Sequence, residues 1–176
     1  MKKLMALLIL FSLTACNGQV KKKEHKAEKA ETEKTEGKFK VTKTDAEWKS
    51  QLSPEEYSVL REKATERPYT GKYDEFFEDG VYVCAACGNP LFKSDNKYNS
   101  HCGWPSFDQA IKGSVIYEED FSHGMHRTEV MCANCGGHLG HVFDDGPKAT
   151  TGERFCTNSV SIKFIPAEEL KKAKKE

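Results

Sequence analysis

The chain has 176 residues, a length typical of one globular domain. It carries 27 basic and 27 acidic side chains, so its formal net charge is zero. This balance excludes an overall electrostatic footprint for nucleic acid or for acidic substrates, and we expect no nucleic-acid partner and a function confined to a local site.

The first 16 residues, MKKLMALLILFSLTAC, have the pattern of a bacterial export signal. Two lysines precede an apolar run from Leu4 to Leu13, which is too short for the ~20 residues of a membrane-spanning helix. The ending LTAC resembles the lipobox of bacterial lipoproteins. We therefore predict a signal peptide at residues 1–15, lipidation of Cys16 and an extracytoplasmic location at a bacterial membrane. A buried core helix is the alternative for the same run.

The segment that follows Cys16 is strongly polar. Between residues 17 and 44 it contains nine lysines and five glutamates, with only scattered apolar side chains. Such a composition cannot bury a core, so we predict that residues 16–44 form a charged, disordered tether behind the lipid anchor. Its lysines could also contact anionic lipid headgroups.

A folded domain is expected at residues 45–168, and it begins with two helix start signals. Each signal is a capping box, in which a hydroxyl residue precedes a glutamate by three positions: Thr44 with Glu47, and Ser53 with Glu56. Pro54 fits the first turn of the second helix, where Tyr57, Leu60 and Ala64 share one face.

After Gly71 the pattern changes to short β-like runs separated by turn residues. The runs are VYVC, SVIYEE, MHRTEVMC, HVF and RFCTNSVSIKFI. We predict a mainly β domain with antiparallel sheet and short N-terminal helices. Residues 169–176 form a basic tail, expected to be a short exposed helix. The chain contains no fixed-period repeat and no glycine-rich phosphate loop.

Two segments, CAACG and CANCG, repeat a pair of cysteines followed by glycine. The four thiols, Cys84, Cys87, Cys132 and Cys135, match a closed tetrahedral zinc site, and we predict one structural Zn²⁺ that clamps two distant hairpins. Four thiolates leave no open position for substrate. Two disulfides, or a thioredoxin-type redox pair without its usual βαβ setting, are the alternatives.

Cys156 lies in the run RFCTNSVSIKFI, where side chains of a strand alternate between two faces. Arg154, Cys156 and Asn158 then share a face with apolar residues further along. A polar end to an apolar stripe indicates a pocket, and a nearby guanidinium favours the thiolate. We predict that Cys156 is a nucleophile, the alternative being a small buried side chain.

Cys102 lies in the loop-like segment NSHCGWPSF. A thiol on a mobile loop is suited to reach a sulfenic acid and to condense with it to a disulfide, so we predict that Cys102 is a resolving cysteine. Trp104 in the same loop either packs in the core or faces a substrate.

The segment GGHLGHVFDDGP places His138 and His141 three positions apart. In a regular strand they would face opposite sides, but a bulge at Gly140 would turn both the same way. At least one of them is expected to donate a proton in the pocket. We interpret His123 and His126 as surface residues.

Four motifs, CAACG, SHCGWPSF, CANCGGHLGHVFDDGP and RFCTNS, occur in the order found in the B-type methionine sulfoxide reductases. The chain resembles this family from about Asp45 to Ile165. The resemblance implies two antiparallel sheets with short N-terminal helices (a β-tent type), a zinc away from the active site, and reduction of the R epimer of methionine sulfoxide, mainly within proteins. His101 departs from the family, because many members carry a small residue there.

The resemblance also implies roles for single residues. Cys156 matches the catalytic cysteine, Cys102 the resolving cysteine, and Trp104 the ring that receives the substrate methyl group. The polar pocket residues of the family match His138, His141, Asp145, Arg154 and Asn158, with His141 expected to be the proton donor.

The implied cycle is attack of Cys156 on the sulfoxide, formation of a sulfenic acid, and closure of a Cys102–Cys156 disulfide that a thioredoxin-like dithiol donor reduces. We expect a monomer. A two-cysteine thiol peroxidase would use the same pair, and a zinc-bearing binding module would use only the four ligands; neither explains all of the motifs.

Overall fold

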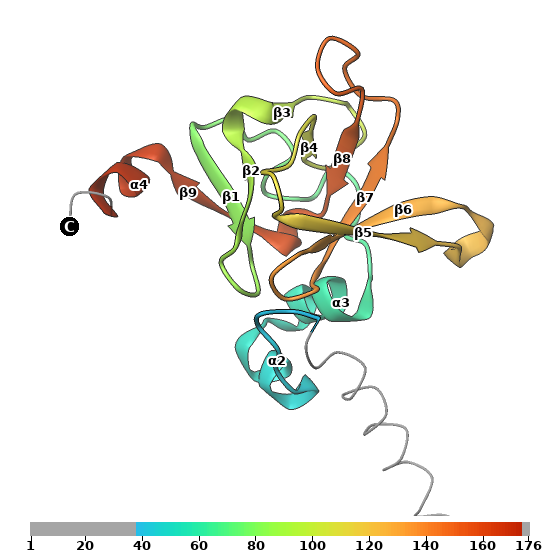
Figure 1. Ribbon diagram of the computed structural model, residues 1–176, viewed down its shortest axis with the longest axis vertical. Helices are drawn as coiled ribbons and strands as arrows, with labels where there is room; N and C mark the ends of the chain where they lie inside the picture. Colours follow the sequence, from blue (N-terminus) through green and yellow to red (C-terminus); the bar gives the residue numbers. More distant parts are fainter. Residues whose placement is uncertain (1–37, 174–176) are drawn as a thin grey trace, which may run out of the picture. The chain divides into compact units, whose positions relative to one another are not determined.

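The structure is a computed structural model that describes residues 38–173 (Figure 1). Within this range the strands form two sheets, in the orders β2-β1-β9 and β3-β4-β8-β7-β6-β5, and every pairing is antiparallel. The mainly β class with short helices, predicted from the sequence, is confirmed. The strands are Gly80–Cys84 (β1), Pro90–Lys93 (β2), Lys97–Tyr98 (β3), Ser106–Phe107 (β4), Val115–Asp120 (β5), Arg127–Cys132 (β6), His138–Phe143 (β7), Arg154–Thr157 (β8) and Ile162–Pro166 (β9).

The helices of the described range are short. They are α2 (Asp45–Gln51), α3 (Pro54–Glu62), α4 (Ala167–Ala173) and the 3₁₀ helices η1 (Ser94–Asn96), η2 (Ser122–Gly124) and η3 (Ser159–Ser161). Both predicted capping boxes are present, and α2 and α3 lie close together in Figure 1. Helix α3 ends earlier than its apolar pattern indicated, because its C-cap Lys63 adopts a left-handed conformation with φ of 59° before Ala64.

The core lies between the two sheets and is largely aromatic. Tyr82 and Phe92 come from the three-stranded sheet, whereas Phe107 and Phe155 come from the six-stranded sheet, and all four are buried. Phe92 stacks on Phe107 with ring centroids 4.3 Å apart, and Tyr82 meets Phe107 edge-on at 5.0 Å. Aromatic pairs of this kind contribute about 1 kcal/mol each beyond their buried area, so they tie the sheets together firmly.

The run RFCTNSVSIKFI is two strands, and the prediction that it forms one is wrong. Strand β8 pairs with β4 and β7 in the larger sheet, whereas β9 pairs with β1 in the smaller one, and η3 turns the chain between them. Strand β8 ends after Thr157 because the chain crosses there to the other sheet. Asn158 therefore lies at the crossover and does not continue the face of β9.

Contacts with the domain begin before Asp45. The Val41 N–H donates to the Asn134 carbonyl at 2.9 Å, and the Val41 side chain packs against the core. Within residues 38–173, the longest helix is too short and too polar to span a membrane. The predicted signal peptide, Cys16 and most of the predicted tether lie outside the described residues.

Candidate functional site

Cys102 and Cys156 lie side by side, although 54 positions separate them in the sequence. Their Sγ atoms are 3.7 Å apart. Strand β4 causes this approach, because Ser106, four residues after Cys102, is the cross-strand partner of Cys156 on β8. A disulfide bond is ~2.05 Å long, so the two sulfurs must come closer by less than one S–S bond length for the bond to form.

The loop that carries Cys102 is held in place by neighbouring backbone. The Tyr69 N–H donates to the Gly103 carbonyl at 2.7 Å, and the Tyr69 hydroxyl donates to the His101 carbonyl at 2.9 Å. Gly103 has φ of 90°, and a Cβ there would lie 2.7 Å from the Pro68 side chain. The mobility that the sequence suggested for this loop is therefore not needed to bring the thiols together.

The thiol pair shares one negative charge. A hydrogen bond from Cys156, together with bonds from nearby hydroxyls, lowers the pKa of Cys102 to about 4. The hydrogen bond with Cys102, burial and the charge on Cys102 raise the pKa of Cys156 well above its ordinary value, and the Arg154 guanidinium lowers it in part. The two thiols therefore do not ionise independently, and ionisation of one opposes ionisation of the other.

Cys156 also lines a pocket of about 100 Å³. The other lining residues are Thr65, Trp104, Arg127, Gly140, Phe143, Thr157 and Asn158. The indole of Trp104 is fixed because its Nε1 donates to the Glu66 carbonyl at 3.1 Å. The structure thus places the predicted ring and the predicted nucleophile at one small pocket with two aromatic side chains.

A buried carboxylate supports this pocket from behind. Glu66 accepts hydrogen bonds from the backbone N–H groups of Ser159 (2.6 Å) and Val160 (3.1 Å), at the start of η3. Burial raises the pKa of Glu66. The Asn158 side chain belongs to the same support: its Oδ1 accepts from the Glu66 N–H, and its Nδ2 donates to the Leu139 carbonyl. Both ends of this amide are therefore committed to backbone.

The bulge predicted at Gly140 is confirmed. Val130 of β6 pairs with Gly140, but Met131 pairs with His138, so Leu139 is an extra residue on β7. Gly140 is required there because a Cβ would lie 2.0 Å from the Cys156 carbonyl oxygen. The bulge turns His138 and His141 toward each other, with ring centroids 5.6 Å apart.

Each of these histidines is held by a carboxylate. His138 Nδ1 lies 2.7 Å from Glu129 Oε1, and His141 Nε2 lies 2.7 Å from Asp120 Oδ2. Burial lowers the pKa of His141 below its ordinary value near 6.5. His141 is the cross-strand partner of Cys156, and side chains at opposed positions of antiparallel strands lie on the same face.

Asp145 and Arg154 form a bidentate ion pair above Phe143. Arg154 Nε and one terminal nitrogen donate to the two Asp145 oxygens at 2.8 and 2.9 Å. The guanidinium also lies 4.4 Å from the centre of the Phe143 ring. The pair holds the guanidinium near Cys156, while the Asp145 carboxylate remains largely exposed to solvent. His123 and His126 are exposed, as predicted.

Sequence reasoning missed the residues that support the site. They are Thr65, Glu66, Ser100, Ser106, Asp120, Arg127, Glu129 and Phe143. For Glu129 a signal was available: a carboxylate within the apolar run RTEVMC must be buried with a partner, and the partner proves to be His138. The others lie on loops (Thr65, Glu66 and Ser100) or at the ends of strands (Ser106, Asp120, Arg127 and Phe143), where a one-dimensional pattern does not identify a neighbour.

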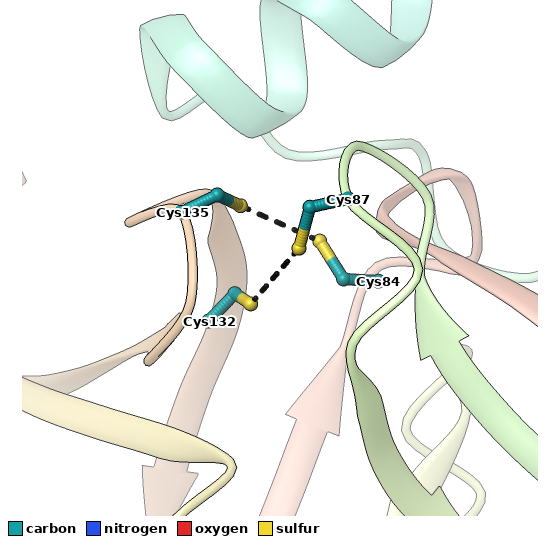
Figure 2. A group of neighbouring side chains, drawn as sticks. All are labelled: Cys84, Cys87, Cys132 and Cys135. Carbon is teal, nitrogen blue, oxygen red and sulfur yellow. Dashed lines mark hydrogen bonds between the residues drawn. The ribbon is translucent and has the colours of Figure 1, made fainter. Parts of the chain in front are cut away.

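The four remaining cysteines of the domain meet at a second site, and Figure 2 shows their side chains converging from two loops. All four Sγ atoms lie within 4.8 Å of one another, with 3.7 Å between Cys84 and Cys135 and between Cys87 and Cys132. Sulfurs ~2.3 Å from a central zinc form a tetrahedron with edges of about 3.8 Å. The cluster can hold a metal ion, and its spacing fits zinc.

The loops around this cluster are alike. Gly88 and Gly136 both have positive φ (74° and 69°), which lets each chain turn back after its second cysteine. Two amides cross between the loops: Asn89 Nδ2 donates to Cys132 Sγ at 3.6 Å, and Asn134 Nδ2 donates to Cys87 Sγ at 3.4 Å. Donors of this kind orient metal-bound thiolates and reduce their charge.

A thiol pair at a small aromatic pocket and a separate four-cysteine cluster that can hold a metal ion, both on two antiparallel sheets, define a thiol-dependent redox protein. Residues 52–166 match the family described as the SelR domain, and the chain belongs to this family. It is similar to proteins named "Peptide methionine sulfoxide reductase MsrB". The relative from Bradyrhizobium diazoefficiens is 58% identical over 128 residues, which cover 72% of this chain and 91% of that protein.

Other relatives of the same name are nearly as similar. The protein from Chromohalobacter salexigens is 55% identical over 130 residues, covering 73% of this chain and 98% of the relative. The protein from Leptospira interrogans is 54% identical over 127 residues, covering 72% and 96%. The compared region is therefore almost the whole of each relative, and it leaves the N-terminal segment of this chain outside.

Proposed function

We propose that this protein reduces the R epimer of methionine sulfoxide, mainly within proteins, to methionine. Membership of the SelR family and the name shared by its relatives support methionine sulfoxide reduction in general. The observation that carries the finer proposal is the thiol pair: Cys156 lines the pocket of Trp104 and lies 3.7 Å from a second thiol. A nucleophile, a site for a methyl group and a resolving thiol are thus adjacent.

The proposed first step is attack of the Cys156 thiolate on the sulfoxide sulfur while His141 protonates the sulfoxide oxygen. The S–O bond of the sulfoxide breaks and its oxygen is transferred to the Cys156 sulfur, which becomes a sulfenic acid. Methionine leaves, and its sulfur has gained the two electrons that Cys156 has lost. Asp120 holds the His141 ring. Trp104 receives the methyl group, and Arg154, with Asp145 behind it, favours the Cys156 thiolate.

Recycling then follows from the position of Cys102. Its thiolate attacks the sulfenic sulfur, a disulfide forms, and the oxygen leaves as water. A dithiol donor of thioredoxin type must reduce this disulfide, because a single disulfide exchange leaves a mixed disulfide that a second thiol resolves. We propose that this donor and oxidised proteins are the partners of the enzyme, and that it does not bind nucleic acid. We also propose that the enzyme is a monomer.

For the four-cysteine cluster we propose one structural zinc ion, held by Cys84, Cys87, Cys132 and Cys135. Zinc would supply folding free energy there by joining the turn after β1 to the turn after β6. The cluster is distinct from the thiol pair, because Cys102 and Cys156 are not among its sulfurs.

The test of the proposed function is an assay on the purified domain with dithiothreitol as reductant and with resolved R and S methionine sulfoxide, free and in a peptide. We expect methionine from the R epimer only, and faster turnover of the peptide. Hydrogen peroxide with the same reductant is the control substrate. Release from S alone would contradict the stereochemical proposal, and faster consumption of peroxide would favour a thiol peroxidase.

We also propose that residues 1–15 are removed and that Cys16 is lipidated, which would hold the enzyme at the outer side of a bacterial membrane on a tether of residues 16–44. The support is the short apolar run and the ending LTAC. We expect Cys16→Ser to move the protein from the membrane to the soluble fraction. Sedimentation with membranes after that change would contradict the anchor.

A further inference from the structure

Two hydroxyl groups lie against the Cys102 sulfur, and neither belongs to the lining of the pocket that contains Cys156. Ser100 Oγ donates to Cys102 Sγ at 3.0 Å, and Ser106 Oγ lies 3.4 Å from the same sulfur. The two hydroxyls are also 2.7 Å from each other. Cys102 therefore belongs to a small polar cluster with these two side chains. We call Ser100 and Ser106 the hydroxyl pair.

The backbone places the hydroxyl pair. Ser106 is buried on β4 directly opposite Cys156, and its hydroxyl donates to the Trp104 carbonyl at 3.2 Å. Ser100 stands before His101, whose φ of 57° reverses the chain, and the Asn99 side chain stabilises that turn by accepting the His101 N–H at 2.9 Å. The turn thereby places the Ser100 and Ser106 hydroxyls in contact with the Cys102 sulfur.

We propose that the hydroxyl pair holds Cys102 as a thiolate, so that Cys102 attacks the sulfenic acid of Cys156 without first losing a proton. This proposal rests on the proposed function, in which Cys102 is the resolving thiol. In the step, an electron pair of Cys102 forms the S–S bond and the S–O bond of Cys156 breaks. The hydroxide takes one proton from solvent and leaves as water, so Cys102 is oxidised and the sulfenic sulfur is reduced.

The charges around Cys102 do not replace the hydroxyls. Arg154 on β8 favours a thiolate, but it is already paired with Asp145. Asp74 in the segment before β1 acts against a negative charge at Cys102. The remaining titratable neighbours are Cys156 on β8, Tyr98 on β3 and His101 in the same loop. When Cys156 is a sulfenic acid its S–H is gone, whereas the Ser100 hydroxyl, 3.0 Å from the Cys102 sulfur, still donates to it.

The test compares the wild type with Ser100→Ala in a single turnover without reductant. Reduced enzyme is mixed with one equivalent of R methionine sulfoxide between about pH 5 and pH 9, and both methionine release and loss of the Cys102 and Cys156 thiols are followed. Because a hydrogen bond to a charged group favours the thiolate over the neutral thiol, we expect the pH midpoint of disulfide formation to rise by about one to two pH units in the variant.

Ser100→Thr, which keeps a hydroxyl, is the matched control and should restore the wild-type profile. A purely structural role of Ser100 would lower the amount of active enzyme without moving the midpoint. Coincident pH profiles for Ser100→Ala and the wild type would overturn the proposal. If the wild type releases no methionine, the proposed function itself fails.

A second measurement does not depend on catalysis. In a Cys156→Ser background, the rate of alkylation of Cys102 is followed against pH by peptide mass spectrometry, with and without Ser100→Ala. We expect Ser100→Ala, and likewise Ser106→Ala, to move the midpoint upward. Equal midpoints in all three proteins would overturn the inference whatever the enzyme reduces.

Discussion

Cys156→Ser is expected to abolish methionine release with every donor, whereas Cys102→Ser is expected to release about one methionine per enzyme in a single turnover. The asymmetry follows from position: of the two thiols only Cys156 lines the pocket with Trp104, whereas Cys102 contacts Cys156 and the hydroxyl pair. Multiple turnover with a thioredoxin-like donor should collapse in Cys102→Ser, because no disulfide can form, although small thiols can reduce the sulfenic acid directly.

The measurement is methionine released per active site, first without reductant and then with each donor. Both variants remove one sulfur from the same pair, so each serves as the control for the other. A first turnover by Cys156→Ser and none by Cys102→Ser would require the two roles to be exchanged.

The Cys102→Ser variant also tests how Cys102 affects the pKa of Cys156. The hydrogen bond with Cys102 is the largest cause that raises the pKa of Cys156, whereas Arg154 lowers it. In Cys102→Ser the negative charge of Cys102 is gone and Arg154 remains, so the pKa of Cys156 falls and its thiolate persists to lower pH. Alkylation of Cys156 should therefore continue to a lower pH in Cys102→Ser than in the wild type.

Among the substitutions considered, loss of any one of the four clustered cysteines is expected to lower the stability of the domain most. Structural zinc contributes ~10 kcal/mol to the folding of small zinc domains, which is comparable with the whole stability of an ordinary domain. Loss of the zinc on replacement of Cys87 by serine should therefore lower the melting temperature by about 40 °C, at roughly 4 °C for each kcal/mol. Prolonged treatment with a chelator should have a similar effect on the wild type.

Metal analysis and thermal unfolding of the same preparation test this expectation. Cys102→Ser is the control, since it also removes a thiol but lies outside the cluster, and its melting temperature should stay near that of the wild type. Protein purified without chelators that contains no zinc, or a Cys87→Ser variant that melts with the wild type, would contradict the proposed metal site.

Local chemistry made much of the fold predictable from the sequence. The capping boxes at Thr44 and Ser53 need only residues three apart, and the two C-x-x-C turns need only their own glycines. The bulge at Gly140 was predictable as a possibility, because only glycine allows the Cys156 carbonyl to approach so closely. These features lie within one short segment each.

Features that depend on two distant segments were not predictable in the same way. The run around Cys156 alternates like a single strand, but β8 and β9 have different neighbours, and the η3 crossover is stabilised by Glu66 from far earlier in the chain. Likewise, nothing near His141 indicates that Asp120 would hold its ring. Burial and pairing across the sheet decide such contacts, and a linear pattern records neither.

The short distance between the two thiols also bears on how long the enzyme survives in its own working conditions. Oxidants that produce methionine sulfoxide also convert a sulfenic acid to sulfinic acid, a state that most proteins cannot reverse. With Cys102 Sγ waiting 3.7 Å away, the sulfenic acid on Cys156 can be captured before a second oxidant molecule arrives. In the proposed cycle, the geometry that completes the reaction would thus also protect the catalyst from irreversible inactivation, and a wider gap between the sulfurs would shorten its working life.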